Sequence, residues 1–467
     1  MYLVFVHGWS VTNTDTYGGL PAALAANAPA GLGLTIGHLY LGKYVSFADE
    51  VTIEDLARGM QAAVEAEVLP TLARGERFAC ITHSTGGPVA RAWMDLHYRG
   101  RLDRCPLSHL VMLAPANHGS ALAQLGKGKL ARMKFFAEGV QPGVGVLDWL
   151  ELGSAQSRAL NSAWLDCDPT RAGIYLFVLT GQSIDRSFYD HLNSYTGEAG
   201  SDGVVRVAAA NLNYGLVRLE QQQEGFALSK QGLSAATALG VLPGRSHTGT
   251  AMGIMESVAA ADDGSHPTVQ AVLWCLAVGS AATYRACARR LDALTARTQT
   301  AERVSRQKEL FLFTRTFTIS RYSMLVFHVR DDRGNELADY DIRLTAGPDY
   351  DPNHLPPGFL IDRQRNSRNP AALTWYLDYD VMAAWFARPQ LQDRLGFEIA
   401  ARPDGGYACY LRASWQGRFS SLKQYFAPNR TLMIEVVLQR RVMEGVFQFT
   451  QKLEPEDFRR QPPGNPL

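Results

Sequence analysis

Ser84 lies in the segment Thr82-His83-Ser84-Thr85-Gly86-Gly87, between an apolar run and a helical pattern. The run at 78–81 predicts a buried strand, and residues 88–96 predict a helix. A serine on such a sharp turn from strand to helix is lifted clear of the sheet, where its hydroxyl can act as a nucleophile. Thr82 stands where this pattern usually has glycine, so we expect its side chain to point away from the helix.

Catalysis by a serine also requires hydrogen-bond donors for the negative charge that develops on the substrate oxygen. The apolar run at 2–6 predicts a first buried strand, and a glycine-containing turn follows it at 7–10. The backbone N–H groups of Trp9 and Thr85 are the candidate oxyanion donors. In the alternative interpretation, residues 7 and 8 only form the turn after a core strand. The candidate substrate contacts in these turns are His7, Gly8 and His83.

The candidate general base is His247. It lies in a loop of small residues at 242–249, after an apolar segment and before a predicted helical run at 251–259. His266 directly precedes a proline and is typical of a helix cap, while His328 lies within a strand-like run of a second domain. The histidines that follow the candidate acid in the chain are His247, His266, His328 and His354, and of these only His247 lies in a suitable loop.

The candidate acid is Asp202, which would orient the histidine. Glycines on both sides give its loop freedom, and the valines that follow can anchor the loop to the core. Asp185 and Asp190 also follow the strand-like run at 174–179. The alternative interpretation is that Asp202 only makes an Asx-turn and that Asp185 is the acid.

Residues 1 to about 275 resemble the lipase and esterase branch of the α/β-hydrolase family. The segment Ala114–Ser120 is similar to the proline-histidine-glycine-serine motif that leads into the lid of bacterial lipases. Residues 160–165 are similar to the leucine-asparagine segment that closes the lid, and 202–205 match the acid loop. The resemblance implies Ser84 as nucleophile, His247 as general base and then general acid, and Asp202 as the orienting carboxylate.

The composition is that of a globular protein with more than one core. The chain has 467 residues, 46% of them hydrophobic and 19% charged, which predicts two domains. A formal net charge of +1 argues against nucleic acid as a partner. The six cysteines form no C-x-x-C pair, so we interpret them as reduced thiols, and no motif indicates a metal or a cofactor.

The sequence shows no apolar run of the roughly 20 residues that cross a bilayer, and it begins with a core strand. We therefore expect a protein made in the cytoplasm without a cleavable signal peptide. It would either remain there or leave by a signal-independent route such as type VI secretion.

Strand-like runs alternate with helical patterns over residues 1–279, which predicts a hydrolase domain with a parallel sheet covered on both faces. An insertion at about 120–173 carries Phe135 and Phe136 among lysines and glycines, as a mobile lid on a lipid surface would. Trp149 would line the same acyl pocket. The alternative is an amphipathic helix packed permanently over the sheet.

The remainder of the chain predicts three further parts. Residues 280–310 form a basic helix that would link two domains. Residues 311–451 contain alternating strands with turn signals between them, which predicts an antiparallel β-sandwich without a catalytic constellation. The proline-rich residues 452–467 predict a disordered tail.

These features favour a serine hydrolase that cleaves carboxylic esters of lipids, as a phospholipase A or a lipase, at a membrane surface. The domain layout is also similar to the phospholipase effectors of type VI secretion, which would give the β-sandwich a secretion-apparatus or immunity-protein partner. One alternative is an acyltransferase or a thioester or polyester hydrolase with the same residues. Another is a non-catalytic binding protein that acts through the β-sandwich.

Overall fold

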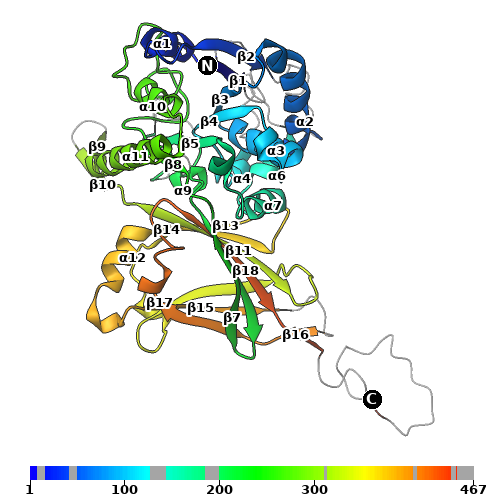
Figure 1. Cartoon of the computed structure of the whole chain (residues 1–467). Helices are drawn as coiled ribbons and strands as arrows, with labels where there is room; N and C mark the ends of the chain where they lie inside the picture. Colours follow the sequence, from blue (N-terminus) through cyan, green and yellow to red (C-terminus); the bar gives the residue numbers. More distant parts are fainter. Residues whose placement is uncertain are drawn as a thin grey trace.

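The computed structural model describes residues 1–7, 16–40, 50–126, 143–184, 199–309, 313–402, 408–442 and 449 (Figure 1). Several predictions from the sequence lie outside these residues. They concern Gly8, Trp9, Phe135, Phe136, Asp185, Asp190 and the tail at 452–467.

The first domain is built on a six-stranded parallel sheet in the order β2-β1-β3-β4-β5-β8. This sheet confirms the predicted α/β class. The central strands β1, β3, β4 and β5 are mainly apolar and buried because both faces of the sheet are covered, whereas the edge strand β2 is partly exposed. The strands are β1 (Tyr2–His7), β2 (Thr35–Tyr40), β3 (Phe78–His83), β4 (Leu107–Leu113), β5 (Tyr175–Thr180) and β8 (Ala238–Val241).

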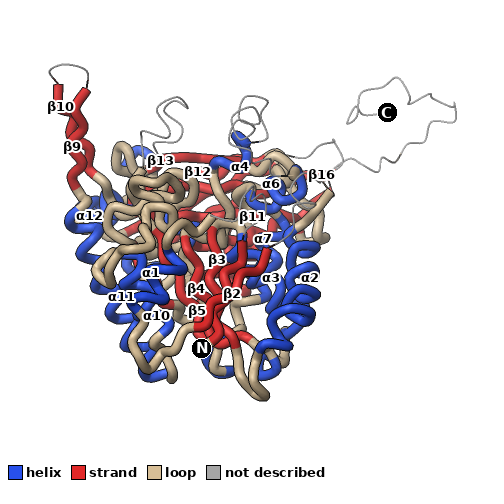
Figure 2. The backbone as a smooth tube through the Cα atoms, turned by 90° about the horizontal axis from the view of Figure 1, so that it is seen from above, coloured by secondary structure: helices blue, strands red, loops and turns tan. Residues whose placement is uncertain are grey.

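Helices cover both faces of this sheet (Figure 2). In β1, Val4 and Val6 join the core under α2 and α3, whereas Leu3 and Phe5 join the core under α1, α10 and α11. Residues of the strand therefore alternate between two hydrophobic cores. The helices are α1 (Leu20–Asn27), α2 (Ile53–Ala63), α3 (Gly86–Tyr98), α10 (Pro267–Leu276) and α11 (Ala281–Ala301).

Helix α11 differs from the predicted linker. Its residues Tyr284 and Leu291 are buried in the core of the first domain, and the hydroxyl of Tyr284 donates to the carbonyl of Leu176 in β5 at 2.7 Å. The helix ends at Ala301, before the antiparallel pair β9 (Val304–Glu309) and β10 (Phe313–Thr318).

A second difference from the prediction concerns residues 251–259, which form turns where the sequence predicted a helical run.

The segment between β4 and β5 contains α4 (Leu122–Gly126), α6 (Val144–Leu150) and α7 (Ala155–Ala163). The remaining short helices are a π-helical turn at Val64–Val68, α9 (Val207–Ala210), α12 (Tyr379–Phe386) and 3-10 turns at Leu69–Thr71, Leu102–Arg104, Pro169–Ala172, Pro352–His354, Pro389–Leu391 and Ser420–Leu422. No helix in the described part of the chain is both long and apolar enough to cross a membrane.

The second domain has a six-stranded sheet in the order β13-β14-β11-β18-β6-β7 and a three-stranded sheet in the order β12-β15-β17. The larger sheet is mixed, because β18 runs parallel to both β11 and β6. Strands β16 and β19 form a separate, antiparallel two-stranded sheet. The strands are β6 (Gly215–Gln222), β7 (Gly225–Leu233), β11 (Tyr322–Asp331), β12 (Tyr340–Ala346), β13 (Leu360–Arg365), β14 (Ala372–Asp378), β15 (Arg394–Ala401), β16 (Ala408–Tyr410), β17 (Ala413–Arg418), β18 (Thr431–Leu438) and β19 (Arg440–Val442).

The two domains are not separated at residue 311. Strands β6 and β7 come from the middle of the sequence, yet they complete the larger sheet of the second domain, where Figure 1 shows them in green. The cores are also continuous. In β11, Met324 and Val326 belong to the core of the first domain, whereas Leu325 and Phe327 belong to the core between the two β-sheets.

Candidate active site

Ser84 lies between the end of β3 and the start of α3, with a positive φ of 52°. A non-glycine residue rarely adopts this conformation, so the turn is strained in the way a nucleophile elbow requires. The backbone N–H of Ser84 donates to the carbonyl of Leu113 in the neighbouring strand β4 at 2.9 Å. This bond fixes the turn at the carboxyl edge of the sheet.

Thr82 is accommodated differently from the expectation. Its side chain faces the start of α3, since a Cβ atom added to Gly86 would lie only 3.0 Å from the Cβ of Thr82. The expectation that it points away from the helix is therefore wrong. Glycine at position 86 leaves the room that the threonine fills, so the pair keeps the close approach of strand and helix that the turn needs.

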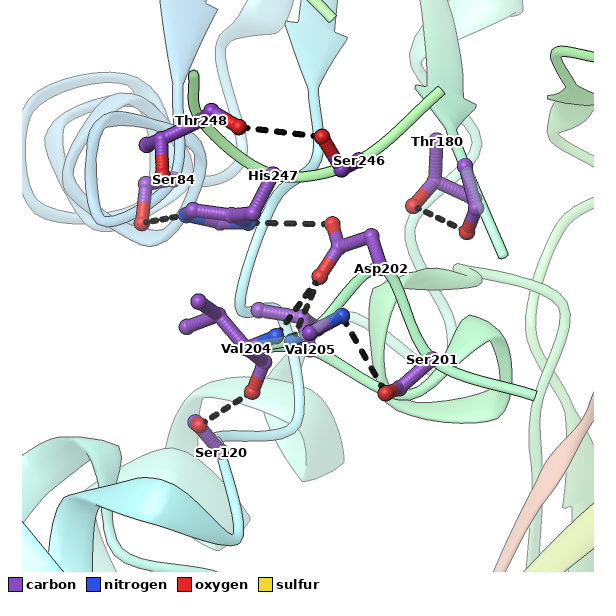
Figure 3. A network of polar contacts seen from close by, with 12 residues as sticks. Ser84, Ser120, Thr180, Ser201, Asp202, Val204, Val205, Ser246, His247 and Thr248 are labelled. Carbon is purple, nitrogen blue, oxygen red and sulfur yellow. Dashed lines mark hydrogen bonds and ion pairs between the residues drawn. The ribbon is translucent and has the colours of Figure 1, made fainter. Parts of the chain in front are cut away.

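The structure brings Ser84, His247 and Asp202 into one chain of hydrogen bonds (Figure 3). The Nε2 atom of His247 lies 3.0 Å from the hydroxyl oxygen of Ser84. The Nδ1 atom lies 2.9 Å from Oδ2 of Asp202. Asp202 is fully buried, and His247 is 4% exposed. A nucleophile, a base and an orienting carboxylate within hydrogen-bond reach are the arrangement that activates a serine.

The carboxylate of Asp202 is held from both sides. Its Oδ1 atom accepts hydrogen bonds from the backbone N–H groups of Val204 at 3.0 Å and Val205 at 2.8 Å, which leaves Oδ2 for the histidine. The backbone also joins the two loops, because the N–H of His247 donates to the carbonyl of Asp202 at 2.8 Å. The Asx-turn that the sequence suggested as an alternative role is thus present together with the contact to His247.

His83 contacts His247 directly. Its Nε2–H group donates to the backbone carbonyl of His247 at 3.1 Å, and the two rings lie 4.7 Å apart. Burial, and then the neighbouring His247, lower the pKa of His83 well below its usual value. His83 is therefore neutral at physiological pH and stays a hydrogen-bond donor. The structure thus places His83 in contact with the candidate base His247. The predicted contact of His83 with substrate stays a prediction.

The candidate oxyanion donor Thr85 is the N-cap residue of α3. The free N–H groups and the dipole at a helix N-terminus favour negative charge there. Strand β1, which ends at His7, pairs with β3 so that Val6 lies beside Thr82. Strand β1 therefore ends at the same edge of the sheet as the elbow, and the donor predicted from Trp9, which lies outside the described residues, stays a prediction.

Solved structures of phospholipase PlaB from Legionella pneumophila are similar to this chain over its whole length. One is 49% identical, covers 99% of this chain and 98% of its own, and has a TM-score of 0.91. Another, in complex with thio-NAD, is 48% identical, covers 100% of this chain and 99% of its own, and has a TM-score of 0.89. The chain belongs to the PlaB family.

The other comparisons give little evidence beyond the match to the PlaB structures. A lipase from Bacillus licheniformis, BlEst2 in its mature form, is 21% identical over 45% of this chain and 78% of its own, with a TM-score of only 0.31. No protein-family model matches the chain, and no curated protein does. The PlaB match itself confirms the predicted α/β-hydrolase relationship and the class of carboxylic ester hydrolase.

Two further residues of this PlaB-family chain concern the predicted lid. Trp149 is 1% exposed and lies in the core that contains α2 and α3, and its role in the acyl pocket stays a prediction. Ser120 donates its hydroxyl to the carbonyl of Val204 at 2.5 Å, so the segment after β4 supports the acid loop. The sequence analysis missed this contact, although Ser120 ends the motif that resembles the entry of a lipase lid.

Proposed function

We propose that this chain hydrolyses carboxylic ester bonds of lipids, with Ser84 as nucleophile, His247 as general base and Asp202 as orienting acid. The observation that carries the proposal is the continuous hydrogen-bond path from the Ser84 hydroxyl through His247 to Asp202, at 3.0 Å and 2.9 Å. The strained backbone conformation of Ser84 costs about 1–3 kcal/mol of folding stability. A catalytic role of this serine would account for that strain.

In the proposed mechanism, the hydroxyl oxygen of Ser84 attacks the ester carbonyl carbon while Nε2 of His247 takes the proton. Asp202 stabilises the resulting imidazolium and fixes its orientation. The N–H groups of Thr85 and Trp9 bind the oxyanion of the tetrahedral intermediate. His247 then gives the proton to the leaving alcohol, and an acyl-enzyme remains. A water molecule, activated by the same histidine, releases the fatty acid and restores Ser84.

The proposed substrate is a phospholipid, and the reaction is that of a phospholipase A. Membership in the PlaB family supports this choice, because PlaB is named a phospholipase and shares 48% identity with this chain over its full length. The predicted export by a type VI route, and a secretion or immunity partner on the second domain, stay predictions from the sequence.

Liposomes of mixed phospholipid and acylglycerol test the proposal. The purified protein and its Ser84→Ala variant are incubated with them, and the products are identified by mass spectrometry. Fatty acid together with lysophospholipid from the wild type alone is the expected result. Fatty acid from acylglycerol alone would make the protein a lipase instead.

A fluorophosphonate probe separates the remaining alternatives. If Ser84 reacts with the probe but no lipid is cleaved, the substrate is another ester or thioester, or the acyl group goes to another acceptor. If the wild type neither reacts with the probe nor releases a product, the proposed catalytic role of Ser84 is wrong and a binding function through the second domain becomes the better account.

A further inference from the structure

The acid loop, residues 199–206, lies against the second domain. The hydroxyl of Tyr376 in β14 donates to the loop, at 3.2 Å from both the carbonyl of Ala199 and that of Gly200. Gly200 has a φ of +76°, and a Cβ atom added to it would lie 2.3 Å from the ring of Tyr322 in β11. The start of the loop therefore rests directly on two stacked tyrosines of the second domain.

The other end of the loop is anchored by Arg206, which is 1% exposed. Its guanidinium forms an ion pair with Asp362 in β13, and it lies over the ring of Tyr376 at 4.2 Å from the ring centre. A buried cation requires such compensation, because leaving it without a carboxylate is costly. Asp362 and Tyr376 both belong to the second domain, so the arginine ties the acid loop to that domain.

Hydrogen bonds within the loop connect these two anchors to Asp202. Ser201 and Arg206 form a β-bridge, and the N–H of Val207 donates to the carbonyl of Gly200 at 3.0 Å. The N–H of Asp202 donates to the carbonyl of Val205 at 3.2 Å. The loop is thus a closed turn whose middle carries the carboxylate and whose ends are fixed by the second domain.

The chain path strengthens this connection. Between Asp202 and His247 the backbone passes through β6 and β7, and β6 pairs with β18 of the second domain. Before β6 begins, the chain is already tied to β18, since the hydroxyl of Thr431 in β18 donates to the carbonyl of Ala208 in α9 at 2.8 Å. Part of the segment that joins acid and base therefore belongs to the sheet on which the acid loop rests.

We infer that Tyr376 and Asp362 of the second domain, together with Arg206, are positioning residues that hold Asp202 in register with His247. The inference rests on the proposed function of Ser84, His247 and Asp202. None of the three positioning residues touches the reacting atoms. They act by fixing the loop that carries the carboxylate, so their loss lowers turnover and leaves substrate binding nearly unchanged.

The test measures kcat and KM for a soluble p-nitrophenyl ester, which reports on the catalytic residues without requiring a lipid surface. Tyr376→Phe removes only the hydroxyl, and Asp362→Asn removes only the charge. Each variant is expected to lower kcat by about tenfold, with KM within about twofold of the wild type. Asp362→Glu is expected to restore most of kcat. The matched control is Arg343→Gln, which breaks an exposed ion pair with Glu398 in the same domain and leaves kcat unchanged.

Thermal unfolding and titration with a fluorophosphonate give the folded and the reactive fraction of each variant. The inference is overturned if both variants keep the wild-type kcat, or if the loss of kcat only equals the loss of reactive protein. It is also overturned if Asp362→Glu is as impaired as Asp362→Asn. A wild type that cleaves the soluble ester but no lipid contradicts the proposed substrate alone. A wild type inactive on every ester contradicts the proposed function and this inference with it.

Discussion

Replacement of Asp202 by asparagine tests the catalytic arrangement most directly. The N–H groups of Val204 and Val205 both donate to Oδ1 of Asp202, so an asparagine must place its oxygen there. Its NH2 group then faces Nδ1 of His247, which must accept, and the proton moves to Nε2. In this tautomer the histidine has no lone pair for the proton of Ser84, so it cannot act as the base.

The magnitude follows from the cost of turning the amide around. The flipped amide would break two backbone hydrogen bonds, at about 1–3 kcal/mol for each donor left unsatisfied. The productive orientation then holds only about 10⁻² to 10⁻⁴ of the molecules. Because the neutral amide also stabilises the imidazolium less than a carboxylate does, we expect kcat/KM to fall by about 10³–10⁴.

The assay compares kcat/KM for a soluble ester, together with the thermal unfolding midpoint, in Asp202→Asn and two controls. Asp331→Asn changes another fully buried aspartate that accepts backbone hydrogen bonds, but lies in the second domain, and it should keep the wild-type rate. Asp185→Asn should also keep it. A folded Asp202→Asn protein with more than a tenth of the wild-type rate would refute the reasoning. A large loss in Asp185→Asn instead would identify that residue as the acid.

Two further predictions concern stability. Gly200→Ala should lower the free energy of unfolding by about 2–4 kcal/mol, because its Cβ meets the ring of Tyr322 in addition to the strain of a positive φ. Gly244→Ala, with a φ of +63° and open space around its Cβ, should cost only about 1 kcal/mol, and equal losses in urea denaturation would contradict the packing argument. Burial, and then Arg91, lower the pKa of His118 to about 3, while in the unfolded chain it is about 6.5. Below pH 6.5 the unfolded state therefore binds a proton that the folded state does not, and stability falls as the pH falls, by about 2 kcal/mol from this residue between pH 6.5 and 5. His118→Gln should lose less stability than the wild type between pH 7 and 5, and an equal loss would show that His118 does not titrate in this way.

The parallel sheet could be predicted because its central strands are apolar on both faces. The mixed sheet of the second domain could not be predicted completely. The second half of strand β6 alternates buried and exposed residues, for example Leu219 with Glu220, and such alternation does not say which sheet the strand joins. Its partner β18 lies about 200 residues away in the sequence. Pairing at that distance is set by the tertiary structure, and no local pattern records it.

Helix α11 shows a different limit. The buried residues Tyr284, Cys287 and Leu291 form one stripe that the sequence already displays, and many of its other residues are charged. A single apolar stripe predicts that a helix packs against something, but it does not identify the surface. The stripe is buried against the first domain, so the helix belongs to that domain and does not form a free linker.

The candidate site was predictable in so far as chemistry constrains residue type. Ser84, Asp202 and His247 each stand in a loop that a small set of residue types must build, so their positions could be found one by one. Arg206 and Asp362 could not, because an arginine and an aspartate 156 positions apart carry no local sign of their pairing. The residues that do the proposed chemistry are visible in the sequence, whereas the residues that hold them in place are largely not.

The sequence of the second domain shows no catalytic motif. Even so, the chain passes from the first domain into the second and back, so we do not expect the first domain to fold independently of the second. Residues 1–279 include β6 but not β18, the strand to which β6 is paired. They would also lack Tyr322, Met324 and Tyr376, which belong to the same hydrophobic core as the helices beside Ser84. A hydrolase domain ending at residue 279 would expose this core and release the acid loop from its support. The second domain therefore forms part of the structure that supports the candidate active site.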